Sequence, residues 1–168
     1  MHRANGSWGF DREDIIASIN AKGRDNARTP MQWDDTPNGG FTTGTPWLRV
    51  NSNYASINAA AALADSNSIF HTYKQLIALR KANPIIVWGD YELIEEGPEQ
   101  LFLYLRRYEG RTWAVAANFG GAAISASVPW LGHSEAIIIA NYERTLVDFA
   151  QLDLQPFEAF AVELAQVN

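Results

Sequence analysis

The spacing of apolar residues changes along the chain, from the period of a helix in the first half to that of a strand in the second. A helix is expected from Asp65 or Ser66 to Asn83, because Pro84 pushes the preceding residue out of the helical region. Its apolar residues have the three-and-four spacing of one helix face. That face consists of Ile69, Phe70, Tyr73, Leu76 and Ile77.

A shorter helix is predicted near the start of the chain. Asp11 is a suitable N-cap with Asp14 three residues on, and Gly23 is a natural stop. The helix is apolar on one side only, so it needs another element to pack against. That side consists of Ile15, Ile16 and Ile19.

Residues 23–53 follow no regular period. Pro and Gly interrupt every candidate element, and Asn and Asp add turn-forming side chains. An irregular stretch of this length inside a compact domain is usually functional or disordered. Two Trp, one Phe and one Met in the stretch favour an ordered, functional loop.

After Pro84 apolar and polar residues alternate, which is typical of strands. The Glu109–Gly110 pair predicts a hairpin turn. Seven short strands separated by turns indicate an antiparallel β-sandwich, with a domain boundary at Asn83–Pro84. The predicted strands are residues 85–88, 91–94, 101–108, 111–119, 123–128, 135–140 and 157–164.

Composition narrows the classes of function. With 47% hydrophobic and 19% charged residues, the chain is typical of a folded domain. A net charge of −6 without a basic stripe argues against nucleic acid and anionic membranes as partners. With no Cys, three scattered His and no phosphate-binding glycine loop, neither a metal nor another cofactor is expected. No apolar stretch is long enough to span a bilayer, so a cytoplasmic protein is the default expectation.

Residues 23–35, GRDNARTPMQWDD, hold most of the polar chemistry. Arg24 and Arg28 each offer a rigid fork of donors, which suits a carboxylate or a pair of sugar hydroxyls. From the residues alone, a network that ties down the loop is as good an interpretation as a binding site. The chain's many aromatic residues fit a core, and they also fit sugar binding.

The same stretch carries a family resemblance. RDNARTPMQWD at residues 24–34, followed by GFTTGTPW at 40–47, resembles the oligo-1,6-glucosidase and α-glucosidase branch of glycoside hydrolase family 13, the α-amylase family. The match continues through VNSNYASIN at 50–58, SIF at 68–70, LIALRK at 76–81 and WGDY at 88–91. It is close over about the first hundred residues and loose over the strand-rich remainder.

The resemblance implies a mixed fold: the last part of a (β/α)8 barrel, with helices and a long loop, followed by an antiparallel β-sandwich called domain C. Residues 1–83 would be the barrel remnant and residues 84–168 domain C. The loop of residues 24–34 would then lie on the catalytic face of the barrel. The chain is expected to be a C-terminal fragment of an enzyme that acts on short α-gluco-oligosaccharides.

The resemblance also implies the chemistry. Family members hydrolyse with retention, using a nucleophile and an acid about 5 Å apart, and a third acid. The motifs that carry these three acids do not occur here, so no catalytic residue is assigned and the chain alone is expected to be inactive. Arg28 is expected to bind the terminal glucose of the substrate. Arg24, Asp25 and Asn26 are expected to shape the loop beside that pocket.

Two other interpretations stay open. The sandwich could bind carbohydrate through exposed Trp88, Trp113 or Trp130, of which Trp113 is expected to point inward. Alternatively, it could serve only to brace the barrel. An exposed apolar surface would then face the missing barrel and allow self-association. The linkage preferred by the whole enzyme, and the choice between hydrolysis and isomerisation, are not decided by these residues.

Overall fold

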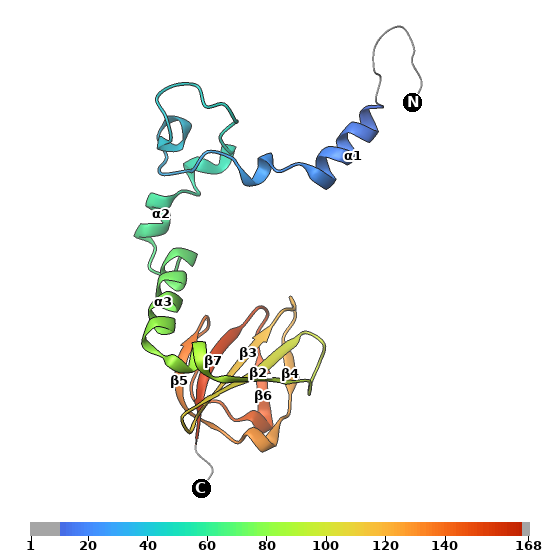
Figure 1. The fold of residues 1–168 in the computed structure, drawn as a ribbon, viewed down its shortest axis with the longest axis vertical. Helices are drawn as coiled ribbons and strands as arrows, with labels where there is room; N and C mark the ends of the chain where they lie inside the picture. Colours follow the sequence, from blue (N-terminus) through green and yellow to red (C-terminus); the bar gives the residue numbers. More distant parts are fainter. Residues whose placement is uncertain (1–10, 166–168) are drawn as a thin grey trace. The chain divides into compact units, whose positions relative to one another are not determined.

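A computed structural model of the 168-residue chain describes residues 11–165, apart from the side chain of Asn26 (Figure 1). The chain forms two compact units that divide between Gln75 and Leu76. The helices are α1 (Arg12–Lys22), α2 (Ala59–Ala64), α3 (Ile69–Ala82) and α4 (Pro84–Trp88). Short 3₁₀ turns lie at Asp25–Ala27, Pro37–Gly40, Ser52–Ala55, Pro129–Leu131 and Phe149–Gln151. No helix of the described part is long and apolar enough to cross a membrane.

The predicted first helix is confirmed as α1, with Asp11 at its N-cap position but without a capping bond from its side chain. The Asp11 side chain accepts no hydrogen bond from the helix, and only its carbonyl oxygen receives the N–H of Ile15 at 3.1 Å. At the other end the Gly23 N–H donates to the carbonyl of Ile19 at 2.7 Å. All three isoleucines of the predicted apolar face are exposed.

The second predicted helix is α3, and it begins later than expected. A separate short helix, α2, precedes it, and Asp65 ends α2 instead of capping α3. Asn58 caps α2, because its side-chain oxygen accepts the N–H of Ala61 at 2.8 Å. The predicted end at Asn83 is confirmed, with extended backbone angles at this residue before Pro84.

The strand predicted at residues 85–88 is wrong, because Pro84 starts the helix α4. Proline at the first helical position has a suitable fixed φ and lacks an N–H group that would be unpaired there. Ile85 is 1% exposed, and the Gly89 N–H donates to its carbonyl at 3.1 Å. The Arg106 guanidinium adds hydrogen bonds to the carbonyls of Ile85, at 3.3 Å, and Ile86, at 3.1 Å.

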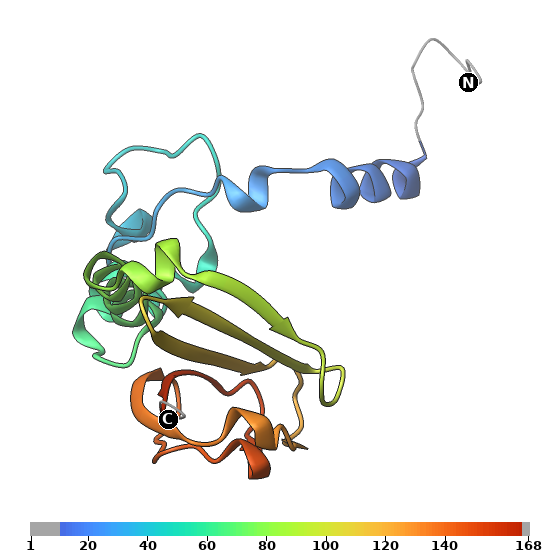
Figure 2. The same ribbon diagram turned by 60° about the horizontal axis from the view of Figure 1, so that its bottom comes forward.

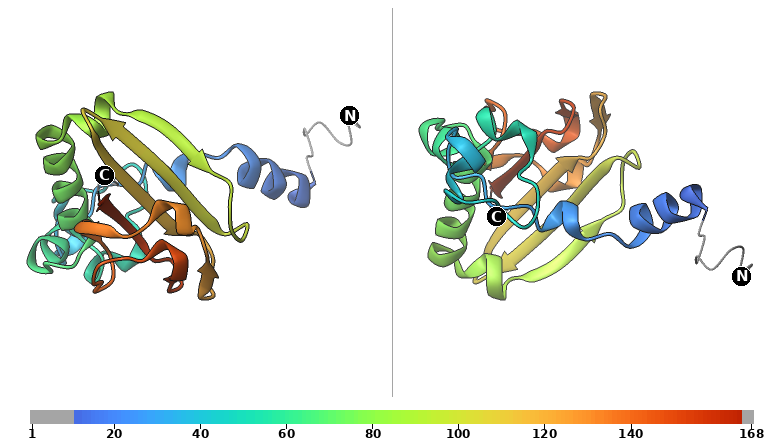
Figure 3. Two further views of the ribbon diagram at one scale, coloured as in Figure 1. Left: turned by 90° about the horizontal axis from the view of Figure 1, so that it is seen from below. Right: turned by 90° about the horizontal axis from the view of Figure 1, so that it is seen from above.

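The rest of the second unit is antiparallel, as predicted. A five-stranded sheet has the order β1-β2-β3-β7-β5, and β4 pairs with β6. Figure 3 shows β1, β2 and β3 side by side. The Leu152–Leu154 strand was not predicted. The strands are β1 (Asp90–Ile94), β2 (Leu101–Tyr108), β3 (Arg111–Asn118), β4 (Ile124–Ala126), β5 (Ser134–Ala140), β6 (Leu152–Leu154) and β7 (Ala159–Leu164).

The hairpin between β2 and β3 turns at the predicted residues. Tyr108 pairs with Arg111, which leaves Glu109 and Gly110 as a two-residue loop. Both have a positive φ, 49° and 78°, as the hairpin turn that matches strand twist requires. The turn fixes the register of the two longest strands of the sheet.

One face of the five-stranded sheet forms the core of the second unit. Alternate residues such as Leu103, Leu105 and Val162 are fully buried there. Core residues from segments on either side of β5, among them Leu131, Phe149 and Leu152, pack against this face (Figure 2). The opposite face carries exposed aromatic side chains on β1 and β2. The burial of 18 hydrophobic side chains in the described chain, most of them in this unit, is the main stabilising term for the sheet.

Candidate functional site

The loop expected to be functional is folded around a small core of its own. Pro30, Gly39 and Val50 are buried, although nearby aromatic side chains such as Trp33 and Trp47 are exposed. A Cβ on Gly39 would meet the Cα of Gln32 at 3.4 Å, so the two arms of the loop pack closely. Tight turns in place of regular elements explain why the sequence shows no period here.

Two residues of the loop hold the start of α2. The carbonyls of Gln32 and Trp33 accept the N–H groups of Ala59 and Ala60, both at 2.9 Å. These N–H groups have no partner inside the helix. The Gln32 side chain also donates to Asn53 Oδ1 at 3.0 Å and to the carbonyl of Ile57. The loop and the short helix therefore form one hydrogen-bonded structure.

Three consecutive residues, Asn38, Gly39 and Gly40, have left-handed backbone angles, with φ of 60°, 64° and 66°. The Asn38 side chain stabilises this turn, since its Nδ2 donates to the carbonyls of Thr42 and Gly44, both at 3.0 Å. A Cβ on Gly40 would lie 2.6 Å from a carboxylate oxygen of Asp34, so only glycine fits. The Asn-Gly-Gly sequence is typical of a turn, but it does not indicate which carbonyls the Asn38 side chain binds.

Asp34 closes a tight turn with Thr36. Its Oδ1 accepts the Thr36 hydroxyl at 2.5 Å and the Thr36 N–H at 2.9 Å. The hydroxyl, and then the N–H, lower the pKa of the Asp34 carboxyl. A lowered pKa means that the charged form supports the turn. That support is present above the usual aspartate pKa of about 3.9 and is lost as the pH falls through the lower, folded value.

Thr36→Val is therefore expected to raise the pKa of Asp34 toward its usual range, because it removes the stronger donor and keeps the N–H. Carbon-detected NMR titration of the side-chain carboxyl would measure the change. Thr42→Val is the matched control, since the Thr42 hydroxyl accepts the Gly44 N–H at 3.1 Å in the same loop. Equal pKa values for Asp34 in the two variants would contradict the assignment.

The predicted binding residue lies in the 3₁₀ turn that opens the loop. The Arg28 N–H donates to the carbonyl of Asp25 at 3.1 Å, and the Ala27 N–H donates to that of Arg24 at 3.0 Å. Arg24, Asp25 and Arg28 are all exposed, and their side chains have no hydrogen-bond or ion-pair partner among the described residues. The turn thus presents two arginine forks and a carboxylate to solvent from adjacent positions.

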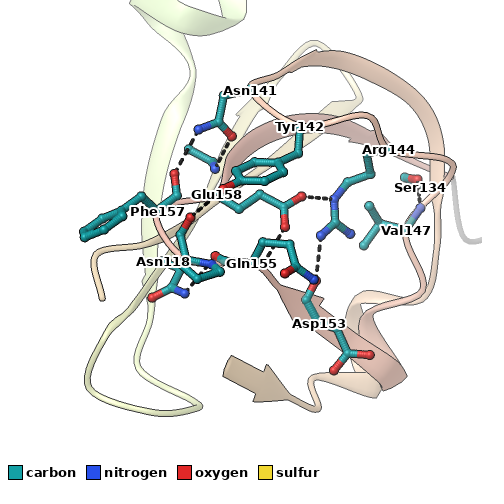
Figure 4. A network of polar contacts seen from close by, with 12 residues as sticks. Asn118, Ser134, Asn141, Tyr142, Arg144, Val147, Asp153, Gln155, Phe157 and Glu158 are labelled. Atoms are coloured by element: carbon teal, nitrogen blue, oxygen red, sulfur yellow. Dashed lines mark hydrogen bonds and ion pairs between the residues drawn. The ribbon is translucent and has the colours of Figure 1, made fainter. Parts of the chain in front are cut away.

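Sequence reasoning missed a buried charged network in the second unit (Figure 4). Glu158 is 2% exposed, and its Oε1 accepts Arg144 Nε at 2.7 Å while its Oε2 accepts the Gln155 N–H at 2.7 Å. Arg144 Nη2 donates to the carbonyl of Asp153 at 2.6 Å, and the guanidinium lies over the Phe160 ring. Burial alone would raise the pKa of Glu158, but these hydrogen bonds outweigh it and lower the pKa.

Neighbouring amides complete this network. Asn118 Nδ2 donates to the carbonyls of Ala122 and Gln155, and Asn141 Nδ2 donates to that of Phe157. Both charged side chains, Glu158 and Arg144, are bonded to other described residues, so the network holds the turn before β7. No cluster of three or more acidic or histidine side chains that could hold a metal occurs within residues 11–165.

The three candidate tryptophans of the second unit differ in their exposure to solvent. Trp113 is 3% exposed, which confirms that it points inward. Trp88 and Trp130 are exposed. The turn that contains Glu95 and Glu96 is exposed, and the Glu96 carboxylate accepts the indole N–H of Trp130.

Comparison with known proteins matches the first half of the chain to one family model. The model for the catalytic domain of α-amylases matches residues 2–89. Among curated proteins, the chain is 46% identical over 162 residues to an oligo-1,6-glucosidase of Halalkalibacterium halodurans, covering 95% of this chain and 29% of that protein. It is 40% identical to a trehalose-6-phosphate hydrolase of Bacillus subtilis, covering 99% of this chain and 30% of that protein.

A solved structure of another relative has a similar fold. The trehalulose synthase of Pseudomonas mesoacidophila MX-45 matches with a TM-score of 0.83 at 34% identity, over 96% of this chain and 29% of the other. The chain therefore spans less than a third of the length of each of these relatives. Their names include two hydrolases and a synthase at comparable identity, so similarity alone does not select one reaction.

Proposed function

Because the chain belongs to the α-amylase family of glycoside hydrolases, we propose that it is the C-terminal part of an α-glucosidase that acts on short α-glucosides. The observation that carries the proposal is the 46% identity to an oligo-1,6-glucosidase over 95% of the chain, together with the RDNAR motif at residues 24–28. The proposal does not specify which glycosidic linkage is cut, because relatives named for different reactions have similar sequence identity to this chain. Cytoplasmic location stays a prediction.

Within this enzyme, we propose that Arg28 binds the terminal glucose and that Arg24, Asp25 and Asn26 shape the loop. The exposed Arg28 side chain supports this role, because it has no partner among the described residues and its donors remain available. The backbone bond from the Arg28 N–H to the carbonyl of Asp25, at 3.1 Å, also supports it, since it holds the arginine in its turn. A positioned guanidinium can hold two sugar hydroxyls at once.

We further propose that residues 84–168 are domain C and that their exposed sheet face packs on the barrel. Four rings form a chain of contacts on that face, from Tyr91 through Tyr104 and Phe102 to Phe119, with centroids 5.3, 5.4 and 6.1 Å apart. Tyr91, Phe102 and Phe119 are exposed. Contiguous apolar surface of this kind usually marks an interface. The exposed faces of α1 and α3 support the same interpretation, and self-association of the isolated chain would follow from it.

The 168-residue chain alone is expected to release no glucose from isomaltose, maltose or an aryl α-glucoside. The retaining mechanism needs a pair of carboxylates that the chain's motifs do not supply. Hydrolysis would be followed by glucose release with highly purified protein. Turnover by the chain alone would contradict the absence of the catalytic acids.

A hybrid enzyme tests the positive side of the proposal. In the Halalkalibacterium oligo-1,6-glucosidase, the segment matched by this chain, 29% of that protein, would be replaced by this chain. We expect the hybrid to hydrolyse isomaltose, because the relative supplies the missing part of the barrel. A folded hybrid that does not bind or hydrolyse any α-glucoside would refute the proposed function.

A further inference from the structure

Trp130 is held on the surface by a rigid support. It lies in the 3₁₀ turn Pro129–Leu131 and is 51% exposed, whereas Val128 and Leu131 on either side are 0% and 5% exposed. The Val128 N–H donates to the carbonyl of Phe149 at 2.7 Å, and the Phe149 N–H donates to that of Gly132 at 3.0 Å. The backbone that carries the indole is therefore fixed on both sides by the core.

The ring itself is fixed by a residue from a distant loop. Its Nε1 donates to both carboxylate oxygens of Glu96, each at 3.1 Å, and Glu96 lies in the connection between β1 and β2. Trp47 and Trp88 are more exposed, at 80% and 72%, but neither indole has a hydrogen-bond partner within the described chain. Trp130 thus differs from them in being both exposed and oriented.

This pair has the chemistry that recognises a neutral sugar ring. The face of an indole is electron-rich, and the C–H groups on one side of a pyranose are weakly positive, so the two surfaces attract and exclude water. A carboxylate has about four acceptor positions, and the single indole N–H leaves most of them free for hydroxyl donors. The negative charge disfavours phosphate groups. A rigid site also loses little conformational entropy on binding.

We propose that Trp130 and Glu96 form a secondary carbohydrate site that binds one pyranose ring of a gluco-oligosaccharide. The indole stacks on the ring, and the carboxylate accepts hydroxyl hydrogen bonds beside it. The site belongs to the sheet unit and not to the loop of residues 24–34, so it adds to any catalytic pocket. It would hold a substrate chain near the enzyme without taking part in the reaction.

NMR titration of the 168-residue chain with maltotriose and isomaltotriose would test the site. The indole N–H resonance of Trp130, identified by its disappearance in Trp130→Phe, is expected to shift and saturate with a dissociation constant on the order of 1 mM. Sorbitol has similar hydroxyls but no ring face, and it is expected to leave the resonance unchanged. This binding needs no catalytic acid, so its outcome is separate from that of the hydrolysis experiments.

Variants identify the residues responsible, and their binding would be followed through neighbouring backbone amides. Trp130→Ala is expected to weaken binding at least tenfold, and Glu96→Gln several-fold, because a neutral amide is a weaker acceptor. Trp88→Ala is the matched control and is expected to bind normally. Trp130→Phe keeps a ring face without the N–H, and intermediate affinity is expected even if Trp130→Ala does not fold.

Three results would overturn the proposal. One is the absence of a saturable shift at about ten times the expected dissociation constant. Another is equal binding by the Trp130 and Trp88 variants. The third is an equal response to sorbitol, which would show that the ring face has no role.

Discussion

Glu158→Ala is expected to lower the free energy of unfolding of the sheet unit by about 3–5 kcal/mol, a large share of the roughly 5–15 kcal/mol that is usual for a domain. The reason is the charge left behind. Arg144 has a side chain that is 16% exposed, and without Glu158 its guanidinium would be buried with no anion. Removing one partner of a buried pair is far more costly than removing both.

Urea unfolding monitored by circular dichroism would measure this change. Glu92→Ala is the matched control, because Glu92 pairs with Arg107 on the surface, where both side chains are about half exposed. That variant is expected to lose less than about 1 kcal/mol. If the free energy of unfolding fell no further in Glu158→Ala than in the control, the buried pair would not be stabilising.

The same pair predicts how stability depends on pH. Burial opposes the charge on Glu158, but the hydrogen bonds from Arg144 and the Gln155 N–H leave its pKa below the usual value. The stabilisation is therefore complete above the usual glutamate pKa of about 4.3 and disappears as the pH falls through the lower, folded value. Glu158→Gln should weaken this acid dependence. An unchanged acid limb in that variant would assign the dependence to other carboxylates.

Arg28→Ala in the hybrid enzyme is expected to lower kcat/KM for isomaltose roughly a hundredfold. A charged donor that binds substrate hydroxyls contributes about 3 kcal/mol through one or two hydrogen bonds, which corresponds to that factor. Steady-state kinetics would separate the effect on kcat from that on KM. A lower kcat together with a higher KM would indicate that Arg28 also positions the sugar for attack.

Arg49→Ala provides the control for this measurement. Arg49 is an exposed arginine of the same unit to which no role is assigned. Its replacement is expected to leave kcat/KM unchanged within about twofold, as is usual for surface substitutions. An Arg28 variant that behaves like the Arg49 variant would remove Arg28 from the binding site.

The sheet could be predicted from the sequence where alternation is regular. Leu101–Tyr108 has the predicted limits, and its alternating leucines Leu103 and Leu105 are buried in the core. Leu152–Leu154 is only three residues long, too short for a period to be recognised. α4 was mistaken for a strand because a run of apolar residues fits both a strand and a buried helix. The tertiary contact from Arg106 is needed to distinguish the two.

The candidate sites were less predictable, since they depend on contacts between distant residues. Arg28 was identified only through the family motif, and its role stays a prediction. The Arg144–Glu158 pair is 14 residues apart, and Trp130 and Glu96 are 34 apart. No periodic pattern links such positions. The sequence could rank Trp130 among the exposed aromatic residues, but not reveal the carboxylate that orients it.

The hydrogen bonds between the loop and α2 have a consequence for the order of folding. A helix of six residues is too short to be stable alone, because the free energy of nucleation exceeds what its few hydrogen bonds contribute. The partners of its first N–H groups come from Gln32 and Trp33, and Gln32 also reaches Ile57, 25 residues later. Helix formation must therefore wait for closure of the loop. The N–H groups of Ala59 and Ala60 should therefore gain their protection from hydrogen exchange only in the kinetic step that closes the loop.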